Sequence, residues 1–529
     1  APAVVSSSSS SSSLSPWKGL LLFKVLFFLS GLSSSTWGRF GIIYYNDVKH
    51  LSPSQIGLLQ GLSPFVALVA QPLWGYVSDY TLRRKVVYVL CKAFSTVCIL
   101  SLSLPCMDTY EKILLCIVVL SMFRSSGVLD AHTLDFLQDH YNNNKRMYGT
   151  IRMWAALSWG LGAVVMGYST DQFGFEYNFI LFGSMMTTVL LLTILCLPAR
   201  SKSELHQHQQ RTQQRLLREQ QREERTLDVH DDDDDDDEEE HQESQLQSLL
   251  PSPTTTVEME NGGNHHDQTS SFEQERKDTQ QEQRIAANTN TNATAAATTT
   301  TTTAETKSTP RLGALWGALC RWPVVLWLFQ VAVMGAAMSL TDSFLFVFLQ
   351  SDLGASAKLC GWTVGFTVML EVPIMARGEY LLQRCGHDVM FGMALSAYAV
   401  RAWGYSILTS STVYWVLPLE LLHGITFGCM WIASVDYSAT VAPASWWTTV
   451  QTILSTTMMC VGGGIGPIVG GMVLEHYGAV ILYRGAGTIV GAVLVFHLIL
   501  WWGYGKGHDA FLEILKQEKE EEEGDDDEE

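Results

Sequence analysis

Charged residues are scarce in this chain of 529 residues, and most of them lie in two polar segments. Asp, Glu, Lys and Arg make up 16% of the chain, and the net charge is −19. Segment 199–313 carries a net charge of −12 and segment 504–529 carries −9, which leaves +2 for the remainder. The acidity therefore belongs to these two segments and implies no basic partner for the apolar remainder, and we expect no nucleic acid partner.

Paired cysteines and metal-ligand spacings are also missing. The ten cysteines are scattered, mostly within apolar runs, without a CxxC pair or a cluster of Cys with His. This distribution predicts neither a disulfide framework nor a zinc site, and we interpret the cysteines as small buried hydrophobic residues. No Ser/His/Asp pattern typical of a nucleophile stands out. We therefore expect neither an enzyme nor a bound cofactor or metal.

Long apolar runs dominate what is present, since 47% of the residues are hydrophobic. A membrane-spanning helix needs about 20 mainly apolar residues, and this criterion predicts twelve such helices. They are 17–44, 53–77, 86–104, 110–134, 148–168 and 177–198 in the first half, and 315–349, 361–376, 389–408, 413–435, 446–474 and 479–502 in the second. The predicted fold class is therefore an all-α membrane protein with six helices in each half.

Low-complexity segments flank and separate the two predicted bundles, 17–198 and 314–503. Residues 1–16 contain a serine tract, and the acidic linker 199–313 lacks the apolar residues that a core requires, so we expect both to be disordered. An acidic tail follows at 504–529. A cleavable signal peptide is not expected, because the first apolar run continues without a convincing cleavage site.

Basic residues give the predicted helices a direction. With the N-terminus in the cytosol, the inner loops and helix ends hold Arg83, Arg84, Lys85, Lys145, Arg146, Arg377 and Arg384, and the outer ones hold Lys49, Lys112, Lys358 and Arg484. Because cytosolic loops are enriched in Lys and Arg, this excess predicts that both termini are cytosolic. The acidic linker is then cytosolic too, where it could bind partners or serve as an inert tether. Plasma membrane and organelle membrane both remain open.

The sequence QPLWGYVSDYTLRRK closes the second apolar run and carries a recognisable spacing. Its pattern Gly75-x-x-x-Asp79-x-x-x-Arg83-Arg84 resembles the loop 2–3 signature of the major facilitator superfamily. One departure is Leu82, where that signature usually has a second glycine. The resemblance implies the major facilitator fold, with twelve transmembrane helices in two pseudo-symmetric six-helix bundles.

Further stretches in both halves resemble one branch of that superfamily, the major-facilitator-associated domain-containing proteins, which are similar to nucleoside and oligosaccharide proton symporters. These stretches are LSPSQIGLLQGL (51–62), QPLWGYVSD (71–79), LDAHTL (129–134), YGTIRMWAALSWG (148–160), EVP (371–373) and LELLHGITFG (419–428). An internal echo agrees with a two-half plan, because Pro72 precedes Arg83 by the same spacing as Pro373 precedes Arg384.

Ionisable residues within the predicted spans are candidates for function, because a charge inside a bilayer needs a partner or a watery cavity. The candidates for substrate or proton binding are Arg124, Asp342, Glu371, Arg401, Glu420 and His423. Glu420 and His423 are three residues apart and would share a helical face, and Arg401 could pair with Glu420. A carboxylate beside an imidazole suits proton binding, and a static buried network is the alternative.

Other charges have several interpretations. Arg124 could bind an anionic or polyhydroxylated substrate, or pair with a carboxylate such as Asp342. Glu371 could be a second protonatable site or a packed structural acid. Arg39 lies near the outer end of the first span, where its side chain could simply reach the membrane interface.

Charges near the cytosolic ends of helices suggest gating or structural roles. The residues in this group are Gly75, Asp79, Arg83, Asp130 and Arg152. We expect Asp130 and Arg152 to form an ion pair between adjacent helices, and Asp79 to join Arg83 or a residue of the other half.

These features predict a secondary active transporter that moves a small polar solute through the lipid bilayer by alternating access. The resemblance suggests a sugar-like or nucleoside-like solute, and the protonatable groups favour proton symport. The alternative is a transporter-like membrane receptor or scaffold that binds a ligand without turnover.

Overall fold

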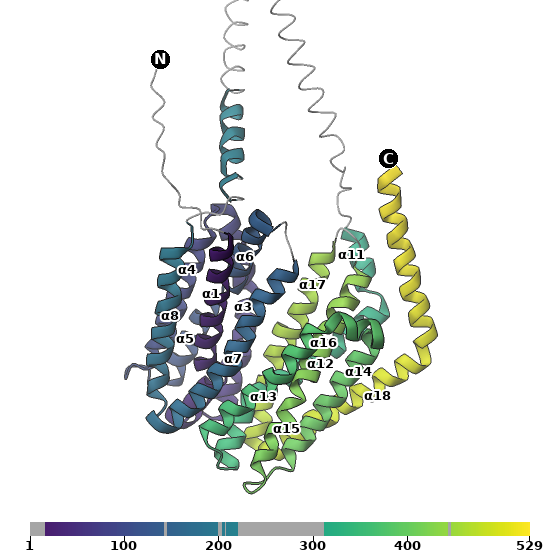
Figure 1. Ribbon diagram of the computed structural model, residues 1–529. Helices are drawn as coiled ribbons and strands as arrows, with labels where there is room; N and C mark the ends of the chain where they lie inside the picture. The colour runs from purple at the N-terminus through teal and green to yellow at the C-terminus, as the bar shows by residue number, and fades with distance from the viewer. Residues whose placement is uncertain are drawn as a thin grey trace, which may run out of the picture. The chain divides into compact units, whose positions relative to one another are not determined.

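The computed structural model describes residues 16–141, 145–198, 204–206, 208–220, 312–442 and 446–528, and the regular secondary structure within these ranges is helical (Figure 1). The disorder expected for residues 1–15 and for most of the linker 199–313 lies outside the described residues. Within the linker, residues 208–220 are helical. Pro16 already belongs to the first helix, and the last helix continues through the acidic tail to Glu528.

The described helices form an early and a late set. The early helices are α1 (Pro16–Trp37), α2 (Phe40–Ile43), the π-helical η1 (Tyr44–Val48), α3 (Pro53–Thr81), α4 (Arg84–Ser101), α5 (Tyr110–Met122), α6 (Ser126–Tyr141), α7 (Lys145–Phe173) and α8 (Glu176–Cys196). The late helices are α11 (Leu312–Leu319), α12 (Trp322–Val347), η2 (Phe348–Asp352), α13 (Ala357–Ala376), α14 (Gly378–Ser406), η3 (Val413–Trp415), α15 (Val416–Leu421), α16 (His423–Val441), α17 (Trp447–Thr456), η5 (Thr457–Gly462) and α18 (Gly463–Glu528). Gly386 (φ +74°) and Gly478 (φ +80°) divide α14 and α18, because glycine tolerates a positive φ that other residues rarely adopt.

Four of the predicted spans are interrupted rather than continuous, which corrects the prediction of single helices there. The run 17–44 is interrupted between the end of α1 at Trp37 and the start of α2 at Phe40. The run 110–134 divides into α5 and α6, the run 315–349 divides at Arg321 before α12, and the run 413–435 breaks at Leu422. A proline in the first turn of α12 explains the break at Arg321, since proline starts a helix readily and cannot continue one.

Eight segments of the described chain are long and apolar enough to cross a membrane. They are Pro16–Val48, Pro53–Thr81, Tyr110–Tyr141, Glu176–Cys196, Trp322–Asp352, Ala357–Ala376, Val413–Val441 and Thr449–Leu500. Large apolar side chains on their outer faces are more than half exposed, among them Leu115, Ile180, Leu195 and Ile489. Such a surface suits contact with lipid chains rather than water.

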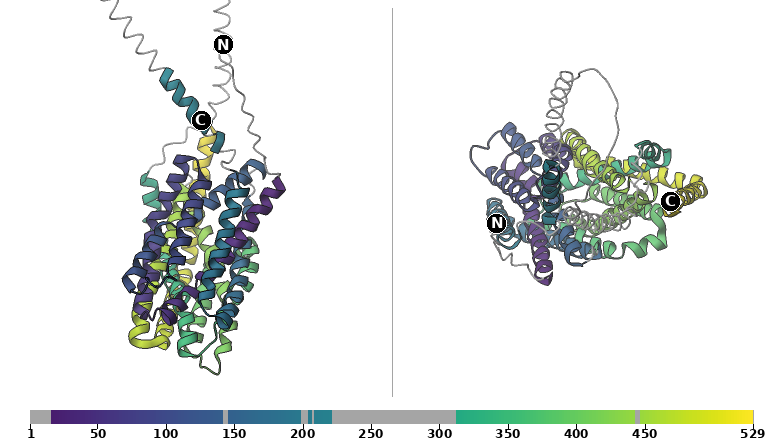
Figure 2. Two further views of the ribbon diagram at one scale, coloured as in Figure 1. Left: turned by 90° about the vertical axis from the view of Figure 1, so that its left-hand side faces the viewer. Right: turned by 90° about the horizontal axis from the view of Figure 1, so that it is seen from above.

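The early helices gather on one side in Figure 1 and the late helices on the other, and the views in Figure 2 agree. The two sets approach to backbone contact at two helix crossings. At Gly167 of α7 and Gly361 of α13, an added Cβ atom would lie 2.4 Å from a backbone oxygen of the facing helix. At Gly57 of α3 and Gly471 of α18 the corresponding distances are 2.3 and 2.4 Å. Small residues therefore allow the two sets of helices to pack closely.

Candidate functional site

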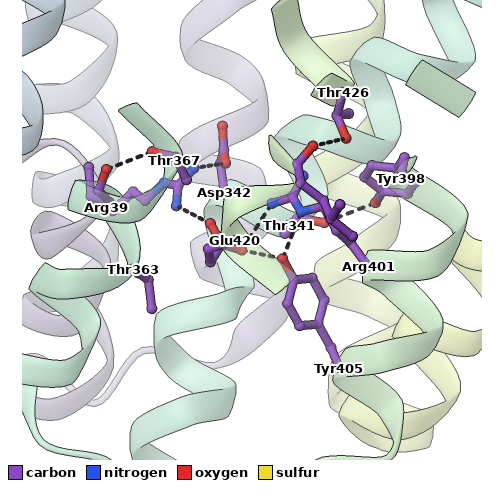
Figure 3. A network of polar contacts seen from close by, with 12 residues as sticks. Arg39, Thr341, Asp342, Thr363, Thr367, Tyr398, Arg401, Tyr405, Glu420 and Thr426 are labelled. Carbon is purple, nitrogen blue, oxygen red and sulfur yellow. Dashed lines mark hydrogen bonds and ion pairs between the residues drawn. The ribbon is translucent and has the colours of Figure 1, made fainter. Parts of the chain in front are cut away.

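Four charged side chains form a network at the contact between early and late helices (Figure 3). Arg39, between α1 and α2, forms an ion pair with Asp342 of α12. A second nitrogen of the same guanidinium lies 3.6 Å from Oε2 of Glu420 on α15. Arg401 of α14 donates from Nη2 to Oε1 of Glu420 over 2.9 Å. We call Arg39, Asp342, Arg401 and Glu420 the charge network, in which Glu420 lies between two guanidinium groups.

Two tyrosines of α14 lie at the charge network, and one of them, Tyr405, is hydrogen-bonded to its members. The Tyr405 hydroxyl donates to Oε1 of Glu420 and accepts from Nε of Arg401 over 3.0 Å. The Tyr398 hydroxyl lies 2.9 Å from the hydroxyl of Thr341 and donates to a backbone carbonyl of α12. Tyr398, Arg401 and Tyr405 follow one another at intervals of three and four residues, so they share one face of α14. This spacing was the available sequence signal for the tyrosines, which sequence reasoning missed.

The members of the charge network differ in their access to water. The side chains of Arg401 and Glu420 are buried, with exposed fractions of 1% and 0%. Asp342 lies deep within the protein, but 43% of its side-chain surface is accessible to solvent. Asp342 therefore faces an internal space, and it is the acid of the network that a proton can reach most directly.

Several polar atoms of the network lack a hydrogen-bond partner among the described residues. They are Nη1 of Arg39, Nη1 of Arg401 and Oε2 of Glu420. Buried polar atoms usually have partners, and losing one member of a buried ion pair costs about 3–5 kcal/mol. The network is thus formally neutral but only partly satisfied, which suits a site that exchanges partners.

The observed contacts confirm some of the pairings predicted for this region and contradict others. The predicted pair of Arg401 and Glu420 is confirmed, and Asp342 belongs to the same network. The interpretation of Arg39 as an interfacial side chain is wrong, because its side chain is only 10% exposed and is paired with two acids. The predicted alternative of an Arg124–Asp342 pair is wrong, because no ion pair joins these two described residues and no carboxylate acts electrostatically on Arg124.

His423 and Glu371 border the charge network without hydrogen bonds to it. His423 begins α16 after the break at Leu422, so it does not share a regular helix with Glu420. Its Nδ1 atom has no partner among the described residues, and its ring lies parallel to that of Phe427 at 6.2 Å. The predicted Glu420–His423 pair is therefore not formed. Glu371 of α13 is half-buried and close enough to interact electrostatically with Arg39 and Asp342.

The predicted gating residues have different partners from those expected. Asp79 pairs with Arg84 over 2.9 Å, and Arg84 also pairs with Asp135, whereas Arg83 is exposed. Leu82 adopts a φ of +51°, the conformation that glycine tolerates best, which agrees with a glycine at that place in the family signature. At Gly75 an added Cβ would meet no atom within 4 Å, so packing does not require glycine there.

The predicted direct ion pair of Asp130 and Arg152 is wrong. Their side chains come no closer than the 4.0 Å limit of an ion pair, although both are described. Arg152 instead donates to the hydroxyl of Tyr148 over 3.4 Å, and Asp130 interacts electrostatically with both residues. Tyr148 therefore stands between the two charges.

Two carboxylates that sequence reasoning missed connect early and late helices. Asp171, near the end of α7, accepts the backbone N–H groups of Ala357 and Lys358 at the start of α13, both over 2.8 Å. Glu475, near the end of the first part of α18, accepts from Ser52 Oγ and Ser54 N at the start of α3, both over 2.9 Å. A negative charge at a helix N-terminus is favourable because the N–H groups there are unpaired and the helix dipole is positive.

Both contacts lie at one end of the helices, which we call the distal end, opposite the end that holds Arg84. A hydrogen bond of 3.1 Å between Asn46 of η1 and Ser351 of η2 joins early and late helices there as well. No motif marks Asp171 or Glu475 in the sequence, because each acquires its role only through a helix that is distant along the chain.

Comparisons with known proteins agree with this architecture. The family model described as "MFS_1 like family" matches residues 20–485. The uncharacterized transporter YwbF of Bacillus subtilis is 29% identical over 163 residues, which cover 30% of this chain and 39% of that protein. The maltose permease of Geobacillus stearothermophilus is 29% identical over 150 residues, which cover 28% of this chain and 37% of that protein. The chain thus matches well under half the length of these two relatives.

Solved structures resemble the whole described fold. The nucleoside transporter NupG covers 90% of this chain and 98% of its own, with a TM-score of 0.64 and 14% identity. A peptide transporter POT in complex with sulfate covers 92% of this chain and 94% of its own, with a TM-score of 0.58 and 12% identity. At these identities the likeness concerns the fold.

Proposed function

We propose that this chain, which belongs to the MFS_1 like family, is a secondary active transporter that moves a small polar solute by alternating access. The family and fold are those of transporters, which are not enzymes, and the chain is a multi-pass membrane protein. The names of similar proteins, a maltose permease and a nucleoside transporter, support a sugar-like or nucleoside-like solute.

The proposal includes twelve spans in two pseudo-symmetric six-helix bundles, 17–198 and 314–503, with the linker and both termini in the cytosol. Eight apolar segments are recognised by length and composition. Adding the helices α4, α7 and α14, and dividing Thr449–Leu500 at Gly478, brings the number of spans to twelve. The excess of basic residues on the side of the N-terminus supports the orientation.

The two carboxylate contacts at the distal end support the two-bundle plan. In that plan α7 is the fifth span of the first bundle and α13 is the second span of the other. The first part of α18 and α3 hold the same two positions with the bundles exchanged. The contact of Asp171 with the start of α13 and the contact of Glu475 with the start of α3 are therefore equivalent under the proposed pseudo-symmetry. Their presence fits a state in which the distal end is closed, and they must break when it opens.

The observation that carries the proposal is the ionic link of Arg39 with Asp342 and Glu420, because it joins the two proposed bundles through the only accessible acid of the charge network. A proton on Asp342 would remove one anion from Arg39. Because Asp342 is partly accessible and Arg39 keeps Glu420 as a second partner, the change is smaller than for a fully buried pair. A change of about 1–2 kcal/mol would still alter an equilibrium between two states by about five- to thirtyfold. Protonation of Asp342 can therefore bias the bundles between their two arrangements.

The test is proton flux in vesicles that contain the purified full-length protein. Neutral sugars and nucleosides are added one at a time while a trapped pH-sensitive dye reports acidification. Solute uptake accompanied by proton entry supports the proposal, and Asp342→Asn should abolish the proton signal. Asp352→Asn, an exposed acid at the end of η2, serves as the matched control. Binding without any uptake across the panel would contradict transport and favour the receptor or scaffold alternative.

A further inference from the structure

The break between α5 and α6 is held open by neighbouring helices. The Met122 carbonyl, freed by the break, accepts from Nε1 of Trp74 on α3 over 2.6 Å. The Phe123 carbonyl accepts from Oγ of Ser95 on α4 over 3.4 Å, and the Phe123 ring stacks on Phe94 with centroids 4.6 Å apart. Backbone groups inside a membrane must find such partners, so the break has a fixed place.

This break places Arg124 about half way across the span. α5 has 13 residues and α6 has 16, which correspond to about 20 Å and about 24 Å of helix on either side. Arg124 is exposed, although it lies deep within the protein. Its charge interacts electrostatically with the Cys460 thiol of η5. Arg124 therefore faces an internal space toward the late helices rather than lipid.

Lys92 supplies a second cation at the same depth. It is at the middle of the 18 residues of α4, and its charge interacts with that of Arg124. Its Nζ atom lies 6.0 Å from the centre of the Tyr88 ring, a weak cation–π contact. Within the described chain, no carboxylate acts on either Lys92 or Arg124.

This arrangement differs from that of the arginines in the charge network, since Arg39 and Arg401 both have acidic partners. Two neighbouring cations without an anion repel each other and are costly in the membrane interior. The first turn of α6, which begins two residues after Arg124, adds the partial positive charge of a helix N-terminus. All three features favour a bound anion.

We propose that Lys92, Arg124 and the first turn of α6 form a subsite for the carboxylate or phosphate group of the solute. This inference rests on the proposed function and narrows it from a polar solute to one that carries an anionic group. Arginine can bind such a group through two parallel hydrogen bonds, and lysine acts as a point charge beside it. Arg39 stays in its ion pairs within the charge network and does not compete for the anion.

Binding to the purified full-length protein in neutral-lipid nanodiscs tests the subsite. The probes are matched solutes that differ by one anionic group, glucuronate against glucose and uridine 5′-monophosphate against uridine, and thermal stabilisation reports binding. We expect the anionic member of at least one pair to stabilise the protein more. Lys92→Gln and Arg124→Gln should each raise its half-saturating concentration at least tenfold, whereas the exposed controls Lys358→Gln and Arg384→Gln should leave it unchanged.

Equal binding of both members of each pair, or unchanged binding in both glutamine variants, would overturn the subsite. Arg124→Lys keeps the charge and should retain part of the affinity, so it replaces Arg124→Gln if that variant does not fold. Competition by added phosphatidylglycerol distinguishes a lipid head group from a free solute: if only the lipid binds, the solute subsite is wrong.

The vesicle assay separates this inference from the proposed function. Uptake of neutral solutes only, unaffected by Lys92→Gln, would overturn the subsite and leave transport standing. Binding of the anionic probe without uptake of any solute would contradict transport and leave the subsite standing.

Discussion

The carboxylate of Asp171 accepts the backbone N–H of Lys358 over 2.8 Å, although 187 positions separate the two residues. The Glu475 carboxylate makes the matching contact with the backbone N–H of Ser54 over 2.9 Å. Each contact combines a side chain at the end of one helix with the unpaired N–H groups at the start of another. Together they make the distal end of the molecule dependent on two negative charges.

Removing these charges should loosen the distal end. A carboxylate at a helix N-terminus contributes about 0.3–1 kcal/mol, so Asp171→Asn or Glu475→Gln should increase the opened population by about two- to fivefold. Cys360, a buried thiol in the first turn of α13, reports this opening. We expect faster modification of Cys360 by an impermeant maleimide, measured by mass spectrometry of its peptide. An unchanged rate in the double variant, with Asp352→Asn as control, would show that the caps do not hold this end closed.

The charge of Asp342 should make transport dependent on pH. If Asp342 accepts the coupled proton, uptake at a fixed solute concentration should increase as the pH on the entry side falls. Asp342→Asn mimics the protonated acid and should show an uptake rate that no longer varies with pH. The measurement is the initial uptake rate in vesicles across a range of external pH. A pH dependence that survives in Asp342→Asn would move proton binding to another group, of which the half-buried Glu371 is the nearest candidate.

The buried pair of Arg401 and Glu420 should be a stability determinant. Glu420→Gln removes the one ion-pair partner that Arg401 has among the described residues, so it should lower the free energy of unfolding by about 3–5 kcal/mol. The double variant Arg401→Gln/Glu420→Gln removes both charges, so its loss should be smaller than the sum of the single losses. Thermal unfolding of the purified protein measures both effects. Strict additivity would mean that the two side chains do not interact in solution as they do across 2.9 Å here.

The crossing of α7 and α13 should not tolerate a larger side chain at Gly361. A Cβ atom there would lie 2.4 Å from the carbonyl oxygen of Ala163, so the helices must separate to admit valine. Gly361→Val should lower the melting temperature and slow the closing of the distal end. Gly485→Ala is the matched control, since a Cβ at that glycine meets no atom within 4 Å. Equal melting temperatures for the two variants would contradict the tight crossing.

Much of the architecture could be predicted from the sequence, because an apolar run of about 20 residues has few stable alternatives to a membrane helix. The places of the helices, the presence of charges within them and the pairing of Arg401 with Glu420 follow from such local rules. Even Leu82, noted as a departure from the family signature, marked a real feature, since its φ of +51° is one that glycine prefers.

The tertiary structure decided which charges meet. Arg39 and Asp342 are 303 positions apart, and sequence spacing says nothing about their contact. The same holds for Asp171 and Glu475 at the distal end, and for the separation of Asp130 from Arg152 by Tyr148. The physical reason is that apolar periodicity acts within one helix, whereas an ion pair depends on how distant helices pack and rotate against each other. The sequence alone therefore determined where the long apolar runs lie and which of them carry charge, and packing alone determined the network that these charges form.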